Sequence, residues 1–361
     1  MNIKTKTFNI GKVFNPLRSQ IGRPKLVYKK LTLLYPSRLN AMALDPGKVN
    51  VNKSGIYTPG EIIFPVKIFK KVIIEARKDS QVIIDTKNGR FQLVLHSVRL
   101  MQKALSIKHG FTVFLEQDHD IKHAGLGSSS GTIAAVATAI NELYDNPITS
   151  FDLIAYLAQN HGEEIAKDDT KLQHVQCIGG SAAAGLVKNG MIVLAGSSLP
   201  IASMNVSEHL DVVIGIPADF KAPDAKKLMT LEMRNMHKFI ATGKLYGPRI
   251  AYEIVHRTLP AMIQGELKDA SRIIFEYRFH YGSINNCSFV YPRMKSMAKK
   301  LEKLFIDADI FTLALSSVGP AFFAITSNKK LCSATFKSLG MNVIVTKPQN
   351  DGYKIVSKKP I

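Results

Sequence analysis

The first 110 residues of the chain contain apolar positions that alternate or come in short runs, which is typical of β-strands. Residues 25–40, KLVYKKLTLLYPSRLN, predict a strand that ends in a turn at Pro36. Residues 61–85 predict further short strands rich in Ile and Val. Residues 91–110 change to helical spacing, and Gly110 is the expected end of that helix.

The middle of the chain mixes strands and helices. An alternating strand at 111–118 is followed by a glycine- and serine-rich turn and by a helix at about 129–144. Residues 147–166 predict another helix, with Thr149 or Ser150 as its N-cap.

The C-terminal half is dominated by helical spacing. It is preceded by a predicted hairpin at 181–196, whose turn is Asn189–Gly190, and by a buried strand at 211–219. About a hundred mostly helical residues follow, and 322–328 and 342–347 supply late strands.

This order of elements predicts an α+β fold in two lobes, and 361 residues suit two domains. The boundary is expected near 199–208. We therefore predict a basic N-terminal extension at 1–30, an N-terminal lobe at 31–203 and a C-terminal lobe at 204–361.

The net charge of +20 leaves two interpretations open. It suits an anionic ligand such as a nucleotide, a sugar phosphate or a nucleic acid, and it equally suits a solvated lysine-rich surface. The 18 Phe and 11 Tyr lie mostly in apolar runs, and no zinc-finger or RNA-recognition signature occurs, so nucleic acid is disfavoured. No run of about 18 apolar residues predicts a membrane span.

The cysteines and the N-terminus bear on location. Cys177, Cys287 and Cys332 are far apart and odd in number, which argues against a disulfide framework and favours a reducing compartment. The first acidic residue is Asp45, so the basic N-terminus suits either an organelle transit peptide or a flexible tail. Pro16 interrupts any amphipathic helix there and favours the tail. We expect a cytoplasmic protein.

The stretch KHAGLGSSSGTIAAVATAINELY, residues 122–144, is chemically suited to a phosphate. A helix start presents free backbone N–H groups and a partial positive charge, and an anion satisfies both. Glycines let the backbone approach a phosphate closely, and serine hydroxyls can donate hydrogen bonds or ligate magnesium. A tight turn with a serine cap is the alternative. The predicted cofactor-binding residues are Gly125, Leu126, Gly127, Ser128, Ser129, Ser130 and Gly131.

This turn and helix resemble the second motif of the GHMP kinase superfamily, which includes galactokinase, homoserine kinase and mevalonate kinase. Residues 35–47, YPSRLNAMALDPG, resemble the first motif through Pro36, Arg38, Leu39 and Asn40. Residues 313–326, LALSSVGPAFFAIT, stand where the third motif packs against the phosphate loop. That segment has one glycine, Gly319, and is similar to the β-ribofuranosylaminobenzene 5′-phosphate synthases of the superfamily.

The resemblance implies a two-lobed fold. Its N-terminal lobe is like domain 2 of ribosomal protein S5 and binds the nucleotide, and its C-terminal lobe is ferredoxin-like. It also implies ATP and Mg²⁺ as cofactors, with a homodimer as a family-level expectation.

Catalytic and metal-binding roles also follow from the resemblance. Magnesium is expected at Ser129 and at a glutamate on the following helix, where Glu163 is preferred to Glu164. An aspartate ahead of a Gly-Gly strand is the base in many of these kinases, with His174 as an alternative here. The predicted catalytic residues are Asp169, Asp168 and Arg38.

The predicted substrate-binding residues come from three segments. Gly179, Gly180 and Ser181 suit either close backbone approach to a ligand or an irregular tight turn. The other members of the predicted substrate site are Asn40, Ser317 and Gly319. A separate polar cluster suits either acceptor recognition or a hydrogen-bonded loop, and it consists of Arg278, His280, Asn285 and Asn286.

Three functions stay open. The resemblance first implies an ATP- and Mg²⁺-dependent kinase that phosphorylates a hydroxyl or similar group on a small metabolite. The third segment favours a transferase that uses phosphoribosyl pyrophosphate, and a non-catalytic nucleotide-binding protein is the last alternative. The expected partners are a small-molecule substrate and a nucleotide, without nucleic acid or membrane.

Overall fold

A computed structural model of the chain describes residues 24–48, 59–86, 89–118, 124–164, 172–175 and 177–361. The strands of this part are β1 (Tyr28–Ala43), β2 (Glu61–Ala76), β3 (Val82–Thr86), β4 (Phe111–Gln117), β5 (Gly162–Glu164), β6 (Leu172–His174), β7 (Met191–Ala195), β8 (Leu199–Met204), β9 (Asp211–Pro217), β10 (Ile310–Leu315), β11 (Phe322–Thr326), β12 (Met341–Thr346) and β13 (Lys354–Pro360). Its α-helices are α1 (Phe91–Ala104), α2 (Ser128–Leu143), α3 (Ser150–Gln159), α4 (Gly180–Leu186), α5 (Ala225–Glu253), α6 (Leu259–Gln264), α7 (Leu267–Ala270), α8 (Arg272–Phe275), α9 (Ser283–Cys287), α10 (Met294–Leu301) and α11 (Lys329–Ser338). Short 3-10 or π-helical segments are η1 (Pro46–Lys48), η2 (Gly196–Ser198), η3 (Ile254–Thr258), η4 (Glu276–His280) and η5 (Glu302–Ile306).

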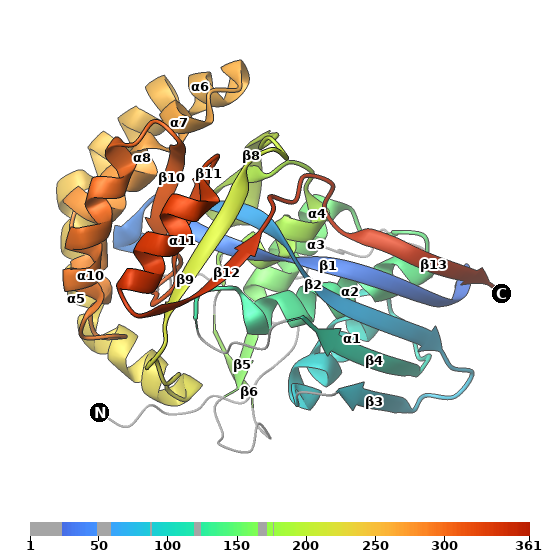
Figure 1. Cartoon of the computed structure of the whole chain (residues 1–361). Coiled ribbons are helices and arrows are strands. Elements are labelled where there is room, and N and C mark those ends of the chain that lie inside the picture. The colour runs from blue at the N-terminus through green and yellow to red at the C-terminus, as the bar shows by residue number, and fades with distance from the viewer. Residues whose placement is uncertain (1–23, 49–58, 87–88, 119–123, 165–171, 176) are drawn as a thin grey trace.

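Two sheets organise the molecule into two lobes (Figure 1). The first has the order β13-β1-β2-β4-β3, and β7 and β8 extend it from the first residues of β2. The second has the order β10-β11-β9-β12. Helices α1 to α4 lie with the first sheet, and α5 to α11 lie with the second (Figure 1). This arrangement confirms the predicted two-lobed α+β fold.

The last strand returns to the first sheet. Strand β13 pairs antiparallel with the first half of β1, from Tyr28 opposite Pro360 to Leu34 opposite Lys354. The residues after the second sheet therefore complete the first one. The division of the chain at residues 203 and 204 stays a prediction.

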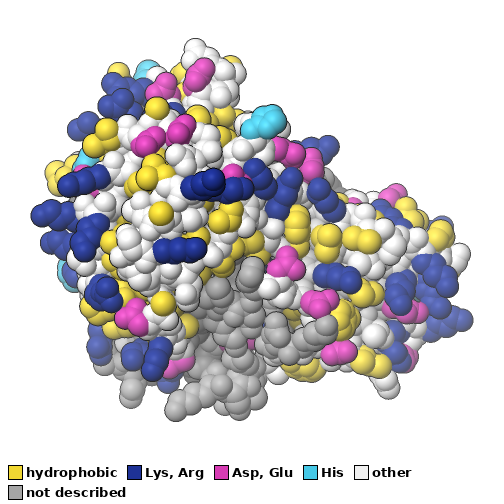
Figure 2. All heavy atoms as spheres, viewed as in Figure 1, with side chains coloured by type: hydrophobic (Ala, Val, Ile, Leu, Met, Phe, Trp, Pro, Cys, Tyr) yellow, Lys and Arg dark blue, Asp and Glu magenta, His cyan; other side chains and the backbone are white. Residues whose placement is uncertain are grey.

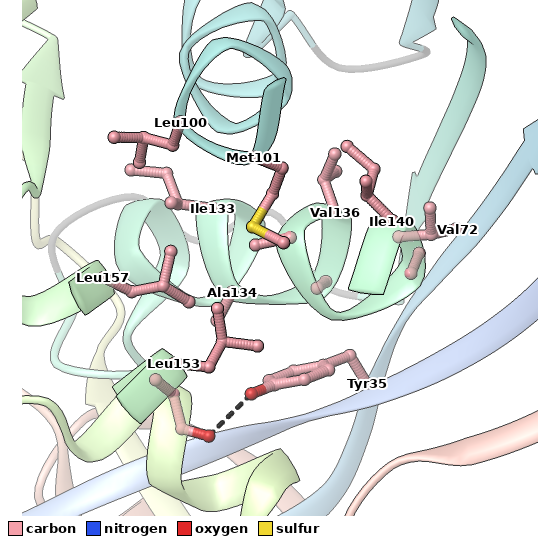
Figure 3. Close-up of a cluster of buried hydrophobic side chains, with 14 of the residues drawn as sticks. Tyr35, Val72, Leu100, Met101, Ile133, Ala134, Val136, Ile140, Leu153 and Leu157 are labelled. Carbon is pink, nitrogen blue, oxygen red and sulfur yellow. Dashed lines mark hydrogen bonds between the residues drawn. The ribbon is translucent and has the colours of Figure 1, made fainter. Parts of the chain in front are cut away.

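The core of the first lobe lies between its sheet and its helices (Figure 3). Val136 and Ile140 of α2 pack with Met101 of α1, and all three side chains are fully buried. Tyr35 of β1 reaches across the same core, where its hydroxyl donates a 2.7 Å hydrogen bond to the carbonyl of Ala182. Burial of these apolar side chains is the main force that holds the helices on the sheet.

Several predicted elements are confirmed with small shifts at their ends, namely β3, β4, α2, β9, β11 and β12. The helix predicted at 147–166 is confirmed only as α3, Ser150–Gln159, and its last part contains strand β5 instead. Thr149 is the N-cap of α3, because its hydroxyl accepts a hydrogen bond from the backbone N–H of Asp152. Three other predictions need correction.

The predicted turn at Pro36 is wrong, because β1 runs on through this residue to Ala43. Strand β13 pairs with β1 only as far as Leu34, so Pro36 lies where that edge has no ladder partner. A proline costs no sheet hydrogen bond at such a position. The pairing with β2 shifts register between Pro36 and Ser37, as a bulge does.

The helix predicted to stop at Gly110 ends at Ala104. Gly110 instead lets two backbones come together, since a Cβ atom there would lie 1.9 Å from the carbonyl oxygen of Gln81. Gly110 does mark a boundary, but it directly precedes β4 rather than capping α1.

The hairpin predicted at 181–196 is also wrong in its first half. Those residues form α4, and the observed hairpin joins β7 to β8. Small side chains let α4 lie close to β1, and a Cβ atom on Gly185 would be 2.2 Å from the ring of Tyr35. Close packing thus selected a helix that propensity alone did not indicate.

A buried carboxylate joins the C-terminal strand to α2. Glu142 accepts a 2.5 Å hydrogen bond from the ammonium of Lys358, a 2.8 Å bond from the amide of Asn146 and a further bond from the hydroxyl of Tyr353. Burial raises the pKa of Glu142, but these donors and the Lys358 charge outweigh it and leave the pKa below its ordinary 4.5.

The variant Glu142→Gln is expected to lower the free energy of unfolding at pH 7 by about 1–3 kcal/mol, because it removes charge-assisted hydrogen bonds. A depressed pKa stabilises the fold above the unfolded value, and that contribution disappears as pH falls through the folded value. The difference between the variant and the wild type should therefore shrink below about pH 4.5. Urea unfolding from pH 3 to 8, with Lys358→Met and the double variant, measures the coupling. Additive single effects would contradict it.

No helix among the described residues is long and apolar enough to cross a membrane. On the face shown in Figure 2, Lys and Arg side chains are scattered among acidic and apolar ones rather than gathered in a stripe.

Candidate functional site

The glycine–serine turn opens α2, as the sequence predicts. Gly127 is the N-cap in the left-handed conformation with φ 69°, and no side chain caps the helix there. The alternative interpretation, a tight turn with a serine cap, is therefore wrong, because no serine caps this helix. The first N–H groups of α2 have no side-chain cap, and residues 125–130 line a cavity of about 340 Å³ between the lobes. An uncapped helix start facing a cavity favours an anion.

The third predicted segment packs against this turn. The Ser316 hydroxyl donates a 2.8 Å hydrogen bond to the Gly125 carbonyl and accepts a 3.0 Å bond from the backbone N–H of Asn40. The backbone N–H of Ser317 donates to the Asn40 carbonyl at 2.8 Å. The structure thus brings all three sequence motifs to one place, and Asn40, Ser317 and Gly319 line the cavity.

Arg38 also lies at the cavity. Its Nη1 donates a 3.0 Å hydrogen bond to the Gly125 carbonyl, and its buried Nε has no hydrogen-bond partner among the described residues. Arg38 therefore braces the turn through one nitrogen. It stands beside the buried Glu61, whose carboxylate accepts a 2.6 Å bond from the N–H of Gly180 and another from the Asn40 amide. Burial raises the pKa of Glu61, and the nearby charge of Arg38 opposes that rise.

Gly179, Gly180 and Ser181 form the start of α4 beside the glycine–serine turn. The hydroxyl of Ser130 donates to that of Ser181 at 2.7 Å. Gly179 has φ 116° and is the N-cap of α4. Within this segment Gly179 and Gly180 do not line the cavity, whereas their neighbour Ile178 does. The start of α4 thus contacts the glycine–serine turn through Ser181, and its two glycines lie outside the cavity lining.

Ser129 and Glu163 form the pair that the sequence predicts for a metal. The Ser129 hydroxyl donates a 2.7 Å hydrogen bond to Glu163 Oε1, and Oε2 of the same carboxylate lies 3.1 Å from His161 Nε2. The predicted location of Glu163 on a helix is wrong, because it lies on strand β5. In a strand, neighbouring side chains point to opposite faces, so Glu163 lines the cavity and Glu164 does not.

The donor set of this pair fits magnesium, which prefers a few protein oxygen ligands together with water and phosphate. Among the described residues no three His, Cys, Asp or Glu side chains gather as a complete metal site. Ser129 and Glu163 are therefore the residues that would hold Mg²⁺, with the remaining positions open to the ligand's own oxygens.

Glu164 has a different role that the sequence did not indicate. It forms a buried 2.6 Å ion pair with Arg90, and Arg90 also donates a hydrogen bond to the Ser128 hydroxyl. The pair links β5 to the start of α2 and so holds the strand of Glu163 against the glycine–serine turn.

Asp168 and Asp169 lie outside the described residues, and so does the side chain of His174. Their predicted roles stay predictions.

The residues of the predicted polar cluster at 278–286 have different surroundings in the structure. Arg278 is buried and lines the cavity, where its guanidinium donates to the carbonyls of Asn40, Ala41 and Ser317 and to the hydroxyl of Ser283. His280 instead bonds Glu276 and Glu302, and Asn286 bonds Thr242. Asn285 is exposed.

The variant Gly127→Ala is expected to lower the free energy of unfolding by about 2–4 kcal/mol, through left-handed backbone strain and overpacking. A Cβ atom there would lie 2.5 Å from Ser181 Oγ. Chemical denaturation measures the effect. Gly247→Ala, where a Cβ atom meets nothing within 4 Å, is the matched control and should be neutral or stabilising. Equal effects of the two variants would contradict the close packing.

Comparison with known proteins bears on this geometry. Residues 92–171, which carry α1, the glycine–serine turn and α2, match a family model described as the GHMP kinases N terminal domain. This is the GHMP kinase fold. The match confirms the resemblance to this superfamily over those residues, which include the second motif.

Solved structures with the GHMP kinase fold superpose on nearly the whole chain. Homoserine kinase from Cytophaga hutchinsonii is 16% identical with a TM-score of 0.60, covering 91% of this chain and 98% of that one. Mevalonate diphosphate decarboxylase from Staphylococcus aureus is 13% identical with a TM-score of 0.65, covering 91% and 98%. Galactokinase from Lactococcus lactis, in complex with galactose, is 12% identical with a TM-score of 0.63, covering 90% and 95%. Comparison with curated protein sequences gives no match.

Proposed function

We propose that the protein is an ATP- and Mg²⁺-dependent kinase that phosphorylates a hydroxyl or similar group on a small metabolite. The observation that carries the proposal is the Ser129–Glu163 pair, 2.7 Å apart, at the uncapped start of α2 and facing one cavity. Kinases and a decarboxylase share this fold, so the fold alone does not choose the reaction.

The residues around the glycine–serine turn have distinct roles in this proposed reaction. The N–H groups and hydroxyls of residues 125–131 would bind the phosphates. Ser129 and Glu163 would hold Mg²⁺, which would neutralise phosphate charge. Arg38 keeps the turn in place through the Gly125 carbonyl. Asp168 and Asp169 remain our candidates for the base. The acceptor oxygen forms a bond to the γ-phosphorus and loses its proton, while the bond from that phosphorus to ADP breaks.

A second candidate is a transferase that uses phosphoribosyl pyrophosphate. It is favoured by the turn 316–320, Ser-Ser-Val-Gly-Pro, whose Ser316 contacts the phosphate-binding turn directly. The same N–H groups suit a pyrophosphate. This candidate differs from the kinase in its product.

The test is a turnover assay with ATP or phosphoribosyl pyrophosphate, with and without Mg²⁺, and with pools of acceptors. ADP and pyrophosphate are measured separately. ADP that needs both Mg²⁺ and an acceptor is the expected result. Pyrophosphate formed only from phosphoribosyl pyrophosphate would identify the transferase. Binding of Mg·ATP with neither product would contradict both and favour a nucleotide-binding protein without turnover.

A further inference from the structure

Part of the lining of the cavity forms an apolar wall. Helix α5 borders the cavity with one face, since Leu228, Glu232 and Met236 are spaced four residues apart and all line it. Phe239 of α5 and Val318 of the turn after β10 line the same space. A bound acceptor therefore meets mainly hydrocarbon on this side, which is typical of a site for an apolar molecule.

Among the described residues of the C-terminal lobe, Arg278 is the one cation that lines the cavity, and its guanidinium already has partners. Every nitrogen of the Arg278 guanidinium donates to a carbonyl or hydroxyl of the protein, at 2.5 Å to Ala41, 3.0 Å to Ser283 and 2.9 Å to Ser317 among others. Arg278 thus holds β1 and the turn after β10 together. It has no hydrogen left for a carboxylate or phosphate of an acceptor.

Glu232 is different, because no hydrogen bond or ion pair reaches its carboxylate within the described part of the chain. It lies in the middle of the apolar face of α5, where an unpaired carboxylate is costly. Burial, and next the charge of Glu163, raise its pKa to about 7. Glu232 and Glu163 line the same cavity, so Glu232 shares it with the Ser129–Glu163 pair as well as with the apolar side chains.

We infer that the acceptor is an alcohol with an apolar body and no anionic group, which presents a hydrogen-bond donor, a hydroxyl or an ammonium, to Glu232. This inference rests on the proposed function for the identity of the site. A donor satisfies the carboxylate, and the hydrocarbon covers the wall. An anionic group beside α5 would meet the carboxylate of Glu232 and no free guanidinium hydrogen from Arg278. The other arginine of the cavity, Arg38, lies at the glycine–serine turn, where its Nη1 donates to the Gly125 carbonyl.

The experiment uses three benzyl alcohols that share one body and differ in a meta substituent. They are 3-methylbenzyl alcohol, 3-(aminomethyl)benzyl alcohol and 3-(hydroxymethyl)benzoate. Binding to the full chain is measured by ligand-observed NMR, with and without Mg²⁺ and a non-hydrolysable ATP analogue. Binding of the analogue is measured separately.

The wild type is expected to bind the amine and the methyl compound at least about tenfold more tightly than the carboxylate. Glu232→Gln should reduce the preference for the amine about tenfold, and Glu232→Lys should shift the ranking towards the carboxylate. Glu266→Gln, the same change at an exposed site, should leave the ranking unchanged.

Tightest binding of the carboxylate, binding of none of the three, or a ranking that both Glu232 variants leave intact would overturn the inference. The Lys variant keeps the test decisive if the Gln variant is poorly folded. Failure of the analogue to bind, with the acceptor ranking as expected, would count against the kinase and not against this acceptor class.

Discussion

The variant Glu163→Gln is expected to lower the turnover number of the proposed kinase by about 10²–10³, because it removes the charged oxygen ligand of Mg²⁺. An amide keeps the shape of the side chain and can still contact the Ser129 hydroxyl, which lies 2.7 Å from Oε1 in the wild type. The loss of turnover should therefore come from weaker metal binding and the missing charge, and the free energy of unfolding should change little.

Two measurements check this expectation. The first is ADP formation with the acceptor that the pools identify. The second is the tightening of nucleotide binding by Mg²⁺, which needs no acceptor and should fall by about tenfold or more. Glu266→Gln is the matched control at an exposed position. Unchanged Mg²⁺ dependence in Glu163→Gln would show that the metal is held elsewhere.

The variant Arg278→Met is expected to lower the free energy of unfolding by about 3–5 kcal/mol. Arg278 is 3% exposed, and its guanidinium satisfies buried backbone carbonyls from two lobes. Burial lowers the pKa of Arg278, yet arginine stays charged at any physiological pH. Methionine fills much of the same volume but leaves the carbonyls of Asn40, Ala41 and Ser317 without this donor.

Chemical denaturation of the full chain measures the effect. Arg272→Met makes the same change six residues earlier, where the side chain is exposed, and should stay within about 0.5 kcal/mol of the wild type. If Arg278→Met were as stable as Arg272→Met, the network would contribute nothing to the junction of the lobes. The binding of the three benzyl alcohols to Arg278→Met could then be measured as a second check.

The glycine–serine turn at the start of α2 was predictable because its chemistry is local. Two glycines, three serines and an alanine-rich helix occur within one short stretch, and helix starts bind anions whatever surrounds them. Ser129 was identified for the same reason. Glu163 was identified by its place after this helix, although the predicted helix around it is a strand.

Glu61, Arg90 and Glu232 were missed because nothing near them in the sequence marks them. Glu61 sits at the start of a strand of Ile and Val, and its partners come from residues 21 and 119 positions away. Arg90 meets Glu164 across 74 residues. Glu232 is one charge in a helix that contains many, and only the fold shows that this one faces the cavity.

By itself the sequence determined the kind of fold, the two lobes and the place of the glycine–serine turn, since periodicity, helix capping and glycine geometry act over a few residues. The tertiary structure alone decided which ionisable groups meet. Arg278 was predicted within a polar cluster, but in the folded chain its guanidinium donates hydrogen bonds to backbone carbonyls. Glu232, in contrast, lines the cavity. Such pairings depend on contacts between distant segments, and a residue's burial, and with it the strength of its charge, is set only when those segments come together.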